Sequence, residues 1–178
     1  MIGRYFMTNN KFKKIVIIGN GGSGKTTLAR YLFEHFKLPI FHLDKYFFDG
    51  WKVVPEKVWK KSHDMLIRQS EWIIEGAQIT EFKQRILASD YVIFLDMPTY
   101  ICAYRFIKKY IDAIRKKMIE DDGFCYDKFS FKSFFWLLSF RRNYRNVIID
   151  CIRTNNKSYM IIKNNKDKRQ YIEKIKNQ

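Results

Sequence analysis

Short apolar runs alternate with longer amphipathic stretches along almost the whole chain. The apolar runs, each bounded by polar or turn residues, predict strands at residues 14–18, 40–43, 72–74, 91–95 and 158–162. The stretches between them place apolar residues at helical spacing, which predicts helices at residues 27–33, 55–69, 78–87, 99–117 and 165–176. Alternation of strands and helices along one chain predicts a mainly parallel sheet with helices on both faces.

The chain contains 178 residues, which fits a single domain over residues 1–178. It has no Pro/Ser-rich linker and no internal repeat that would indicate a second domain. No apolar run approaches the roughly 18 residues that a membrane span needs, and residues 1–10 lack a signal-peptide pattern. We therefore expect a cytoplasmic protein without a membrane partner. The three widely spaced cysteines indicate neither a disulfide framework nor a zinc site.

A glycine-rich segment directly follows the first predicted strand and matches the pattern G-x-x-x-x-G-K-[ST]. In this pattern backbone N–H groups surround phosphate oxygens, Lys25 lies near the β- and γ-phosphates, and the Thr26 hydroxyl is available to Mg²⁺. The positive end of the following helix adds to the attraction. A strand before and a helix after distinguish this phosphate loop from a glycine-rich turn that binds nothing, so we expect ATP and Mg²⁺ as ligands. The expected nucleotide-binding residues are Gly19, Gly21, Gly22, Ser23, Gly24, Lys25, Thr26 and Thr27.

Acidic residues follow three further strands at the point where each strand ends: Asp44, Glu75 and Asp96. Because ligands of parallel sheets bind at the carboxyl ends of the strands, these carboxylates would border the phosphate loop. The alternative is that they are solvated strand ends or helix caps. Asp96 is the weaker metal candidate. We expect His42 to point to the opposite face and to be packed or hydrogen-bonded rather than catalytic.

The formal net charge is +16, from 34 basic and 18 acidic side chains. Such an excess fits binding of nucleic acid, binding of anionic nucleotides, or simply AT-rich coding. Residues 1–101 carry 15 basic and 10 acidic side chains, and residues 102–178 carry 19 and 8. The excess therefore lies mainly beyond the phosphate-loop half, and nucleic acid stays open as a partner.

Four segments together resemble adenylate-kinase-related P-loop proteins, and among them the group named DNA topology modulation protein, FlaR-type. The segments are the phosphate loop and residues 41–44, 72–76 and 91–98. The resemblance covers nearly the whole chain, although only the phosphate loop is specific by itself. It implies a three-layer α/β P-loop NTPase fold with a five-stranded parallel sheet and a helical lid at approximately residues 118–146. It also implies phosphoryl transfer from ATP to a small acceptor.

The resemblance also implies roles for single residues. Glu75 stands where relatives carry the Asp of an Asp-Gly pair, and would hold Mg²⁺ through a water. Asp44 resembles the acid that contacts the acceptor hydroxyl or the magnesium shell, which makes it the candidate base. Arg105 stands where relatives hold an arginine facing the nucleotide. Arg141 and Arg145 share a helix face and resemble lid arginines that close over phosphates.

Three further features leave alternatives open. Residues 46–51 form an aromatic segment that would either stack on a base or pack in the core. Residues 129–138 are aromatic and basic, which fits lid packing or a dimer face, and both a monomer and a homodimer remain open. Arg85 would either bind an acceptor phosphate or be exposed.

The leading functional hypothesis is a kinase that transfers the ATP γ-phosphoryl group to a nucleoside, a nucleotide or a similar metabolite. The second is a DNA-binding P-loop regulator of DNA topology, although the sequence shows no helix-turn-helix, zinc-finger or OB-type signature. The third is an NTP-hydrolysing conformational switch.

Overall fold

The structure, a computed structural model, describes residues 2–3, 12–50, 52–116 and 130–177. Its strands are β1 (Ile2–Gly3), β2 (Lys14–Gly19), β3 (Ile40–His42), β4 (Phe48–Asp49), β5 (Lys52–Val53), β6 (Trp72–Gly76), β7 (Tyr91–Leu95) and β8 (Ser158–Ile162). Its helices are α1 (Lys25–Phe36), α2 (Asp44–Phe47), α3 (Glu56–Ile67), α4 (Phe82–Ala88), α5 (Thr99–Lys116), α6 (Phe131–Thr154) and α7 (Asn165–Lys176).

The main sheet has the strand order β1-β8-β7-β2-β6-β3. β2 lies at its centre and pairs in parallel with β6 and β7, while β3 and β8 extend the sheet on either side, again in parallel. These five strands confirm the predicted five-stranded parallel sheet. The short strand β1 pairs antiparallel with β8 and was not indicated by any apolar run. The carboxyl ends of the five parallel strands therefore meet at one edge of the sheet.

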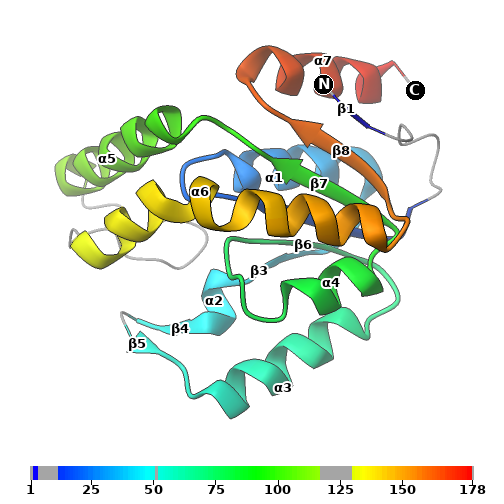
Figure 1. The fold of residues 1–178 in the computed structure, drawn as a ribbon, viewed down its shortest axis with the longest axis horizontal. Coiled ribbons are helices and arrows are strands. Elements are labelled where there is room, and N and C mark those ends of the chain that lie inside the picture. The colour runs from blue at the N-terminus through cyan, green and yellow to red at the C-terminus, as the bar shows by residue number, and fades with distance from the viewer. Residues whose placement is uncertain (1, 4–11, 51, 117–129, 178) are drawn as a thin grey trace.

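Helices cover both faces of the sheet, as the alternation of elements predicts. Successive side chains of β2 point to opposite faces: Ile15 and Ile17 belong to the core beneath α1 and α7, and Val16 and Ile18 to the core beneath α3, α4 and α6. Because both faces are buried, the strand is apolar at every one of these positions. Figure 1 shows α6 crossing the front of the sheet with α1 behind it. The arrangement confirms the three-layer α/β fold.

The ends of several elements differ from the sequence-based bounds. The helix expected at residues 78–87 begins only at Phe82, and the helix after the phosphate loop is longer than expected and begins at Lys25. The end of α2 and strand β4 lie within the aromatic segment at residues 46–51, of which Trp51 lies outside the described residues.

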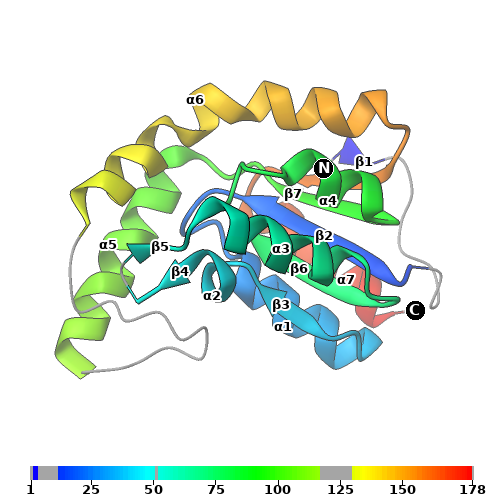
Figure 2. The same cartoon turned by 90° about the horizontal axis from the view of Figure 1, so that it is seen from below.

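The predicted lid falls partly outside the described residues, which exclude residues 118–129. Residues 131–146 form the first part of α6, which continues without a break to Thr154. Figure 2 shows this part of α6 beside α5, at one end of the molecule, in agreement with the packing of the two helices. A lid role for this segment stays a prediction.

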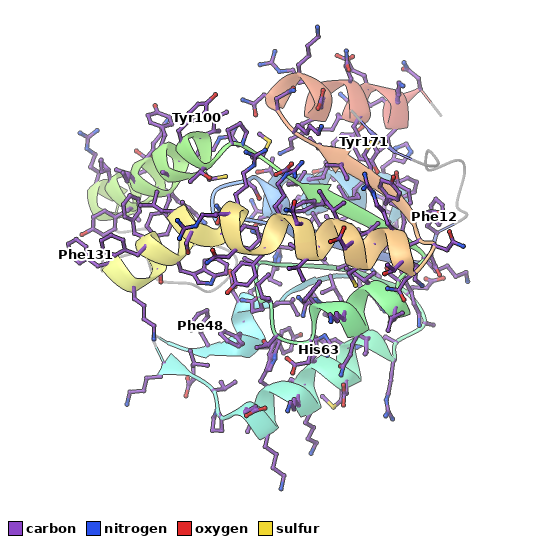
Figure 3. The ribbon with its side chains drawn as sticks, in the orientation of Figure 1. Phe12, Phe48, His63, Tyr100, Phe131 and Tyr171 are labelled. Carbon is purple, nitrogen blue, oxygen red and sulfur yellow. The ribbon has the colours of Figure 1, made fainter. Side chains whose placement is uncertain are left out.

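Two aromatic side chains of the first aromatic segment, Tyr46 and Phe47, pack against the core. The rings of Phe47 and Trp59 meet edge-on with their centroids 5.0 Å apart, and Tyr46 packs against the same core. In the second segment Phe134 packs near Phe106, whereas Phe131, at the outer end of α6 in Figure 3, is 70% exposed.

Among the described helices, none has both the length and the apolar character that crossing a membrane requires.

Two basic side chains are fully buried between α3 and α4. Arg85 donates hydrogen bonds to the backbone oxygens of Gln78 and Thr80, so it is neither exposed nor open to a ligand in this structure. This contradicts the expectation that a non-binding Arg85 would be exposed, because the side chain instead secures the loop before α4. Burial lowers the pKa of Arg85 to about 9. His63 (Figure 3) lies nearby, and neither ring nitrogen has a hydrogen-bond partner among the described residues.

Acidification is expected to destabilise the protein through His63. Burial, helped by the charge of Arg85, lowers the pKa of His63 from its ordinary 6.5 to about 4. Between pH 6.5 and pH 4 His63 is protonated in the unfolded chain and neutral in the folded chain. The contribution of His63 to the free energy of unfolding is therefore fully present above pH 6.5 and is lost as the pH falls towards 4. From pH 7 to pH 5 the free energy of unfolding should fall by about 2 kcal/mol through this residue.

Urea unfolding at both pH values measures this loss. The free energy of unfolding of His63→Leu should change less between the two pH values than that of the wild type, by that amount. His35 is an exposed histidine on α1, and the change for His35→Gln should match that of the wild type. Equal pH sensitivity of wild type and His63→Leu would contradict the prediction.

Candidate active site

The phosphate loop joins β2 to α1 at the central position of the sheet. Gly22 and Gly24 have φ angles of 69° and 91°, in the left-handed region that glycine tolerates best. Helix α5 lies so close that a Cβ atom on Gly22 would be 2.5 Å from the backbone oxygen of Cys102. The Ser23 hydroxyl is buried and has no partner among the described residues. The unpaired hydroxyl and the left-handed glycine conformations are features that fit a phosphate-binding loop.

Gly22→Ala should destabilise the fold more than Gly50→Ala. Both glycines have positive φ, but a Cβ atom on Gly50 would meet nothing within 4 Å. We expect Gly50→Ala to cost about 1 kcal/mol from backbone strain and Gly22→Ala about 3 kcal/mol, because the clash with Cys102 adds to that strain. Chemical denaturation of both variants gives the difference. Equal losses would show that α5 does not confine the phosphate loop.

Lys25, Thr26 and Glu75 converge at the carboxyl edge of the sheet. Lys25 is nearly buried and donates to the backbone oxygen of Asn20 (2.9 Å). The Thr26 hydroxyl donates to Glu75 Oε1 (3.0 Å), and His42 Nδ1 lies 2.8 Å from the same oxygen. The structure thus brings together the residues expected to contact phosphate and Mg²⁺.

His42 was correctly expected to be hydrogen-bonded but was assigned to the wrong face. In the β3–β6 pairing His42 stands opposite Glu75, so their side chains lie on the same face of the sheet. The register between β3 and β6, which the sequence does not specify locally, brings His42 to the site.

Glu75 is buried beside groups that favour its charged form. Burial alone would raise its pKa, but the hydrogen bond from His42 and the charge of Lys25 outweigh that effect, so the pKa of Glu75 lies below its ordinary value. A carboxylate held next to a threonine hydroxyl is a suitable partner for a hard divalent cation and its waters. The Thr26 hydroxyl and the Glu75 carboxylate are therefore groups that would fit Mg²⁺.

Asp44 begins α2, immediately after β3. The backbone N–H of Leu43 donates to the backbone oxygen of Glu75 (2.9 Å), which draws the start of α2 to the end of β6. Gln78 Nε2 donates to Asp44 Oδ1 and orients the carboxylate. The sequence had not indicated Gln78, because it lies in the loop before α4 that was expected to be helical.

Two basic side chains, one from α5 and one from α7, donate hydrogen bonds to backbone oxygens of the phosphate loop. Arg105 on α5 donates to the backbone oxygen of Gly22 (3.4 Å) and to Asn165 Oδ1 (2.7 Å). Lys168 on α7 donates to the backbone oxygen of Gly24 (3.0 Å). Burial and the charge of Arg105 lower the pKa of Lys168 to about 8. The family resemblance indicated Arg105, whereas no sequence pattern indicated Lys168, although α7 follows the end of β8 and so begins at the same sheet edge.

Asp96 follows β7 and pairs with both predicted lid arginines. Its side chain is fully buried; Arg141 Nε donates to Oδ1 and Arg145 Nε to Oδ2, each at 2.8 Å. The hydrogen bond and charge of Asp96 raise the pKa of Arg141. Both carboxylate oxygens are thus engaged by arginine, an arrangement different from the metal ligand considered from the sequence.

Comparison with known proteins places this geometry in context. No protein-family model and no curated protein matches the sequence. Shikimate kinase from Acinetobacter baumannii, solved with shikimate, is similar with a TM-score of 0.55 and 15% identity over 94% of this chain and 93% of its own. Deoxyadenosine kinase from M. mycoides with bound dATP has a TM-score of 0.53 and 14% identity over 92% of this chain and 97% of its own.

A gluconokinase from Sinorhizobium meliloti 1021 is similar with a TM-score of 0.50 and 11% identity, covering 93% of this chain and 92% of its own. These similarities extend over nearly the full length of both partners. None of them confirms the resemblance to the DNA topology modulation group. The parallel sheet, the phosphate loop and the flanking helices described above show that this chain has the fold of small-molecule P-loop kinases.

Proposed function

We propose that this protein transfers the γ-phosphoryl group of ATP to a small acceptor such as a nucleoside, a nucleotide or a similar metabolite. The observation that carries the proposal is the convergence of the phosphate loop with Asp44 and Glu75 at one edge of the sheet, bordered by arginines from α5 and α6. Phosphoryl transfer depends mainly on positioning and charge neutralisation, and these residue types supply both. The kinase names of the structural neighbours support an acceptor of small-metabolite size.

The donor side comprises the phosphate loop, Lys25 and Arg105. Backbone N–H groups of the loop and the Ser23 hydroxyl would bind phosphate oxygens, and Lys25 would exchange the Asn20 oxygen for the β- and γ-phosphates. Thr26 and Glu75 would hold Mg²⁺, which neutralises phosphate charge when bound.

The acceptor side is assigned to Asp44, oriented by Gln78. For an alcohol acceptor, the hydroxyl oxygen forms a bond to the γ-phosphorus while its proton passes to the Asp44 carboxylate. The bond between the γ-phosphorus and the β–γ bridging oxygen breaks, and ADP leaves with that electron pair. For a phosphate acceptor no base is needed. Arg141 and Arg145 would neutralise charge on the transferring group.

Turnover of ATP with Mg²⁺ across a panel of nucleosides, nucleotides and small alcohols tests the proposal. ADP and phosphorylated product are identified by mass spectrometry. A product that forms with one acceptor class would support the kinase and name its substrate. Phosphate release without a phosphorylated product would favour the NTP-hydrolysing switch, and absence of turnover would direct attention to salt-dependent DNA binding.

A further inference from the structure

We propose that Asp96 is a positioning residue that holds Arg141 and Arg145 as a preset pair directed at the terminal phosphate of a bound nucleotide. The two arginines and Asp96 form this arrangement with one another, through one hydrogen bond from each arginine to the carboxylate. The inference rests on the proposed function only in that a nucleotide occupies the phosphate loop.

Asp96 lies beside the first residue of the phosphate loop. β7 pairs with β2 so that Leu95 stands opposite Gly19, and a Cβ atom on Gly19 would be 2.9 Å from the Leu95 backbone oxygen. Asp96, the next residue, therefore leaves the sheet at the point where the chain enters the loop. This position is fixed by strand pairing rather than by a surface loop.

The stretch of α6 that carries the arginines contacts the same loop through a hydrogen bond and through side-chain packing. Asn20 Nδ2 donates to the backbone oxygen of Leu137 (2.8 Å), and a Cβ atom on Gly21 would lie 3.2 Å from the Leu137 side chain. Arg141 follows Leu137 by one helical turn and so projects on the same side of α6. The charges of Lys25 and Arg141 both act on the buried thiol of Cys102, which agrees with their placement around one site.

The bonding pattern leaves phosphate-binding groups available. Each arginine uses Nε towards Asp96, and the guanidinium side chains remain 43% and 33% exposed for Arg141 and Arg145. Among the described residues, Arg141 makes no other hydrogen bond, and Arg145 makes one further bond, from Nη1 to the exposed Asn146 (3.2 Å). The terminal amino groups can therefore donate to an anion without leaving Asp96.

The charges explain why a carboxylate is needed at this position. Two arginines four residues apart on a helix repel each other, and one buried carboxylate lets both approach the loop. One negative charge against two positive charges leaves a net charge of +1 for an incoming phosphate. A neutral side chain at residue 96 would release the arginines from one another and from the site.

Equilibrium binding of Mg²⁺ with either ADP or an ATP analogue whose β–γ bridge is an imido group tests the role of Asp96 without an acceptor. We expect the wild type to bind the ATP analogue more tightly than ADP. Asp96→Asn should weaken binding of the analogue by roughly 10-fold, as expected for loss of positioned charge-assisted hydrogen bonds, and leave ADP binding within about threefold. Arg142→Ala, an exposed neighbour on α6, should match the wild type.

A double-mutant cycle separates positioning from a merely structural role. If Asp96 acts through the arginines, Asp96→Asn should weaken binding of the ATP analogue no further in an Arg141→Ala/Arg145→Ala background. The arginine double variant leaves the buried Asp96 carboxylate without these partners, so circular dichroism must show that it folds; Arg145→Ala alone, which keeps Arg141 on Asp96, serves as the test if it does not. The proposal is overturned by equal weakening of ADP and analogue in Asp96→Asn, by retained discrimination in the arginine double variant, or by a wild type that does not distinguish the two nucleotides.

These outcomes are distinguishable from failure of the proposed function. A wild type that favours the ATP analogue through Asp96 but phosphorylates no acceptor would contradict the kinase and support the positioning role. A wild type that phosphorylates an acceptor, with nucleotide discrimination unchanged in Asp96→Asn, would contradict the positioning role and support the kinase.

Discussion

Lys25→Ala is expected to abolish phosphoryl transfer, with kcat reduced by ~10³-fold or more, while the fold remains intact. The Lys25 ammonium group donates to the Asn20 backbone oxygen, and in the proposed mechanism it would exchange that partner for phosphate. Its removal takes away a positive charge where negative charge must be stabilised during transfer. Steady-state kinetics with the acceptor identified by the panel, together with the thermal midpoint, measure both parts of the expectation.

Lys83→Ala is the matched control for Lys25→Ala. Lys83 is exposed on α4, and replacing it with alanine changes the net charge by the same amount as Lys25→Ala. It should leave kcat and the thermal midpoint close to wild type. Full turnover in Lys25→Ala would remove the phosphate loop from the mechanism.

Asp44→Asn should lower transfer to a hydroxyl acceptor by ~10²-fold or more and leave the Kd of ATP nearly unchanged. Asparagine keeps the size of the side chain but cannot accept the acceptor proton, and Gln78 can still hydrogen-bond to its amide oxygen. The effect should appear in kcat rather than in nucleotide binding. Single-turnover kinetics and ATP titrations separate the two quantities.

Asp150→Asn, an exposed position on α6, controls for the lost negative charge and should behave as wild type. Weakened ATP binding with unchanged chemistry in Asp44→Asn would reassign Asp44 to the magnesium shell. Unchanged binding and unchanged chemistry with an alcohol acceptor would exclude it as the base.

The sequence predicted those features that depend on neighbouring residues. β7 and β8 begin and end at the predicted residues, because each is a short apolar run between polar residues. The phosphate loop is a contiguous pattern whose glycines require backbone conformations that other residues adopt with strain, as the positive φ of Gly22 and Gly24 shows. The strand–helix alternation then placed Glu75 at the edge that carries the loop.

Contacts between distant segments could not be read from the same patterns. Lys168 lies 144 residues from Gly24, whose backbone oxygen it binds, and no local spacing connects them. Arg85 has the sequence of an ordinary helix surface residue, yet α3 and the loop before α4 enclose it completely. Helix packing decides such burial, and periodicity does not specify which neighbouring helix covers a given face.

By itself the sequence determined the order and type of the main elements and the presence of a phosphate loop at the end of the first long strand, because hydrophobic periodicity and a contiguous motif are local properties. The tertiary structure decided the partners of the charged side chains. Strand register places His42 opposite Glu75. The packing of α6 against the phosphate loop brings Arg141 and Arg145 to Asp96. These pairings depend on how strands align and helices pack in space, which no single segment of the chain encodes.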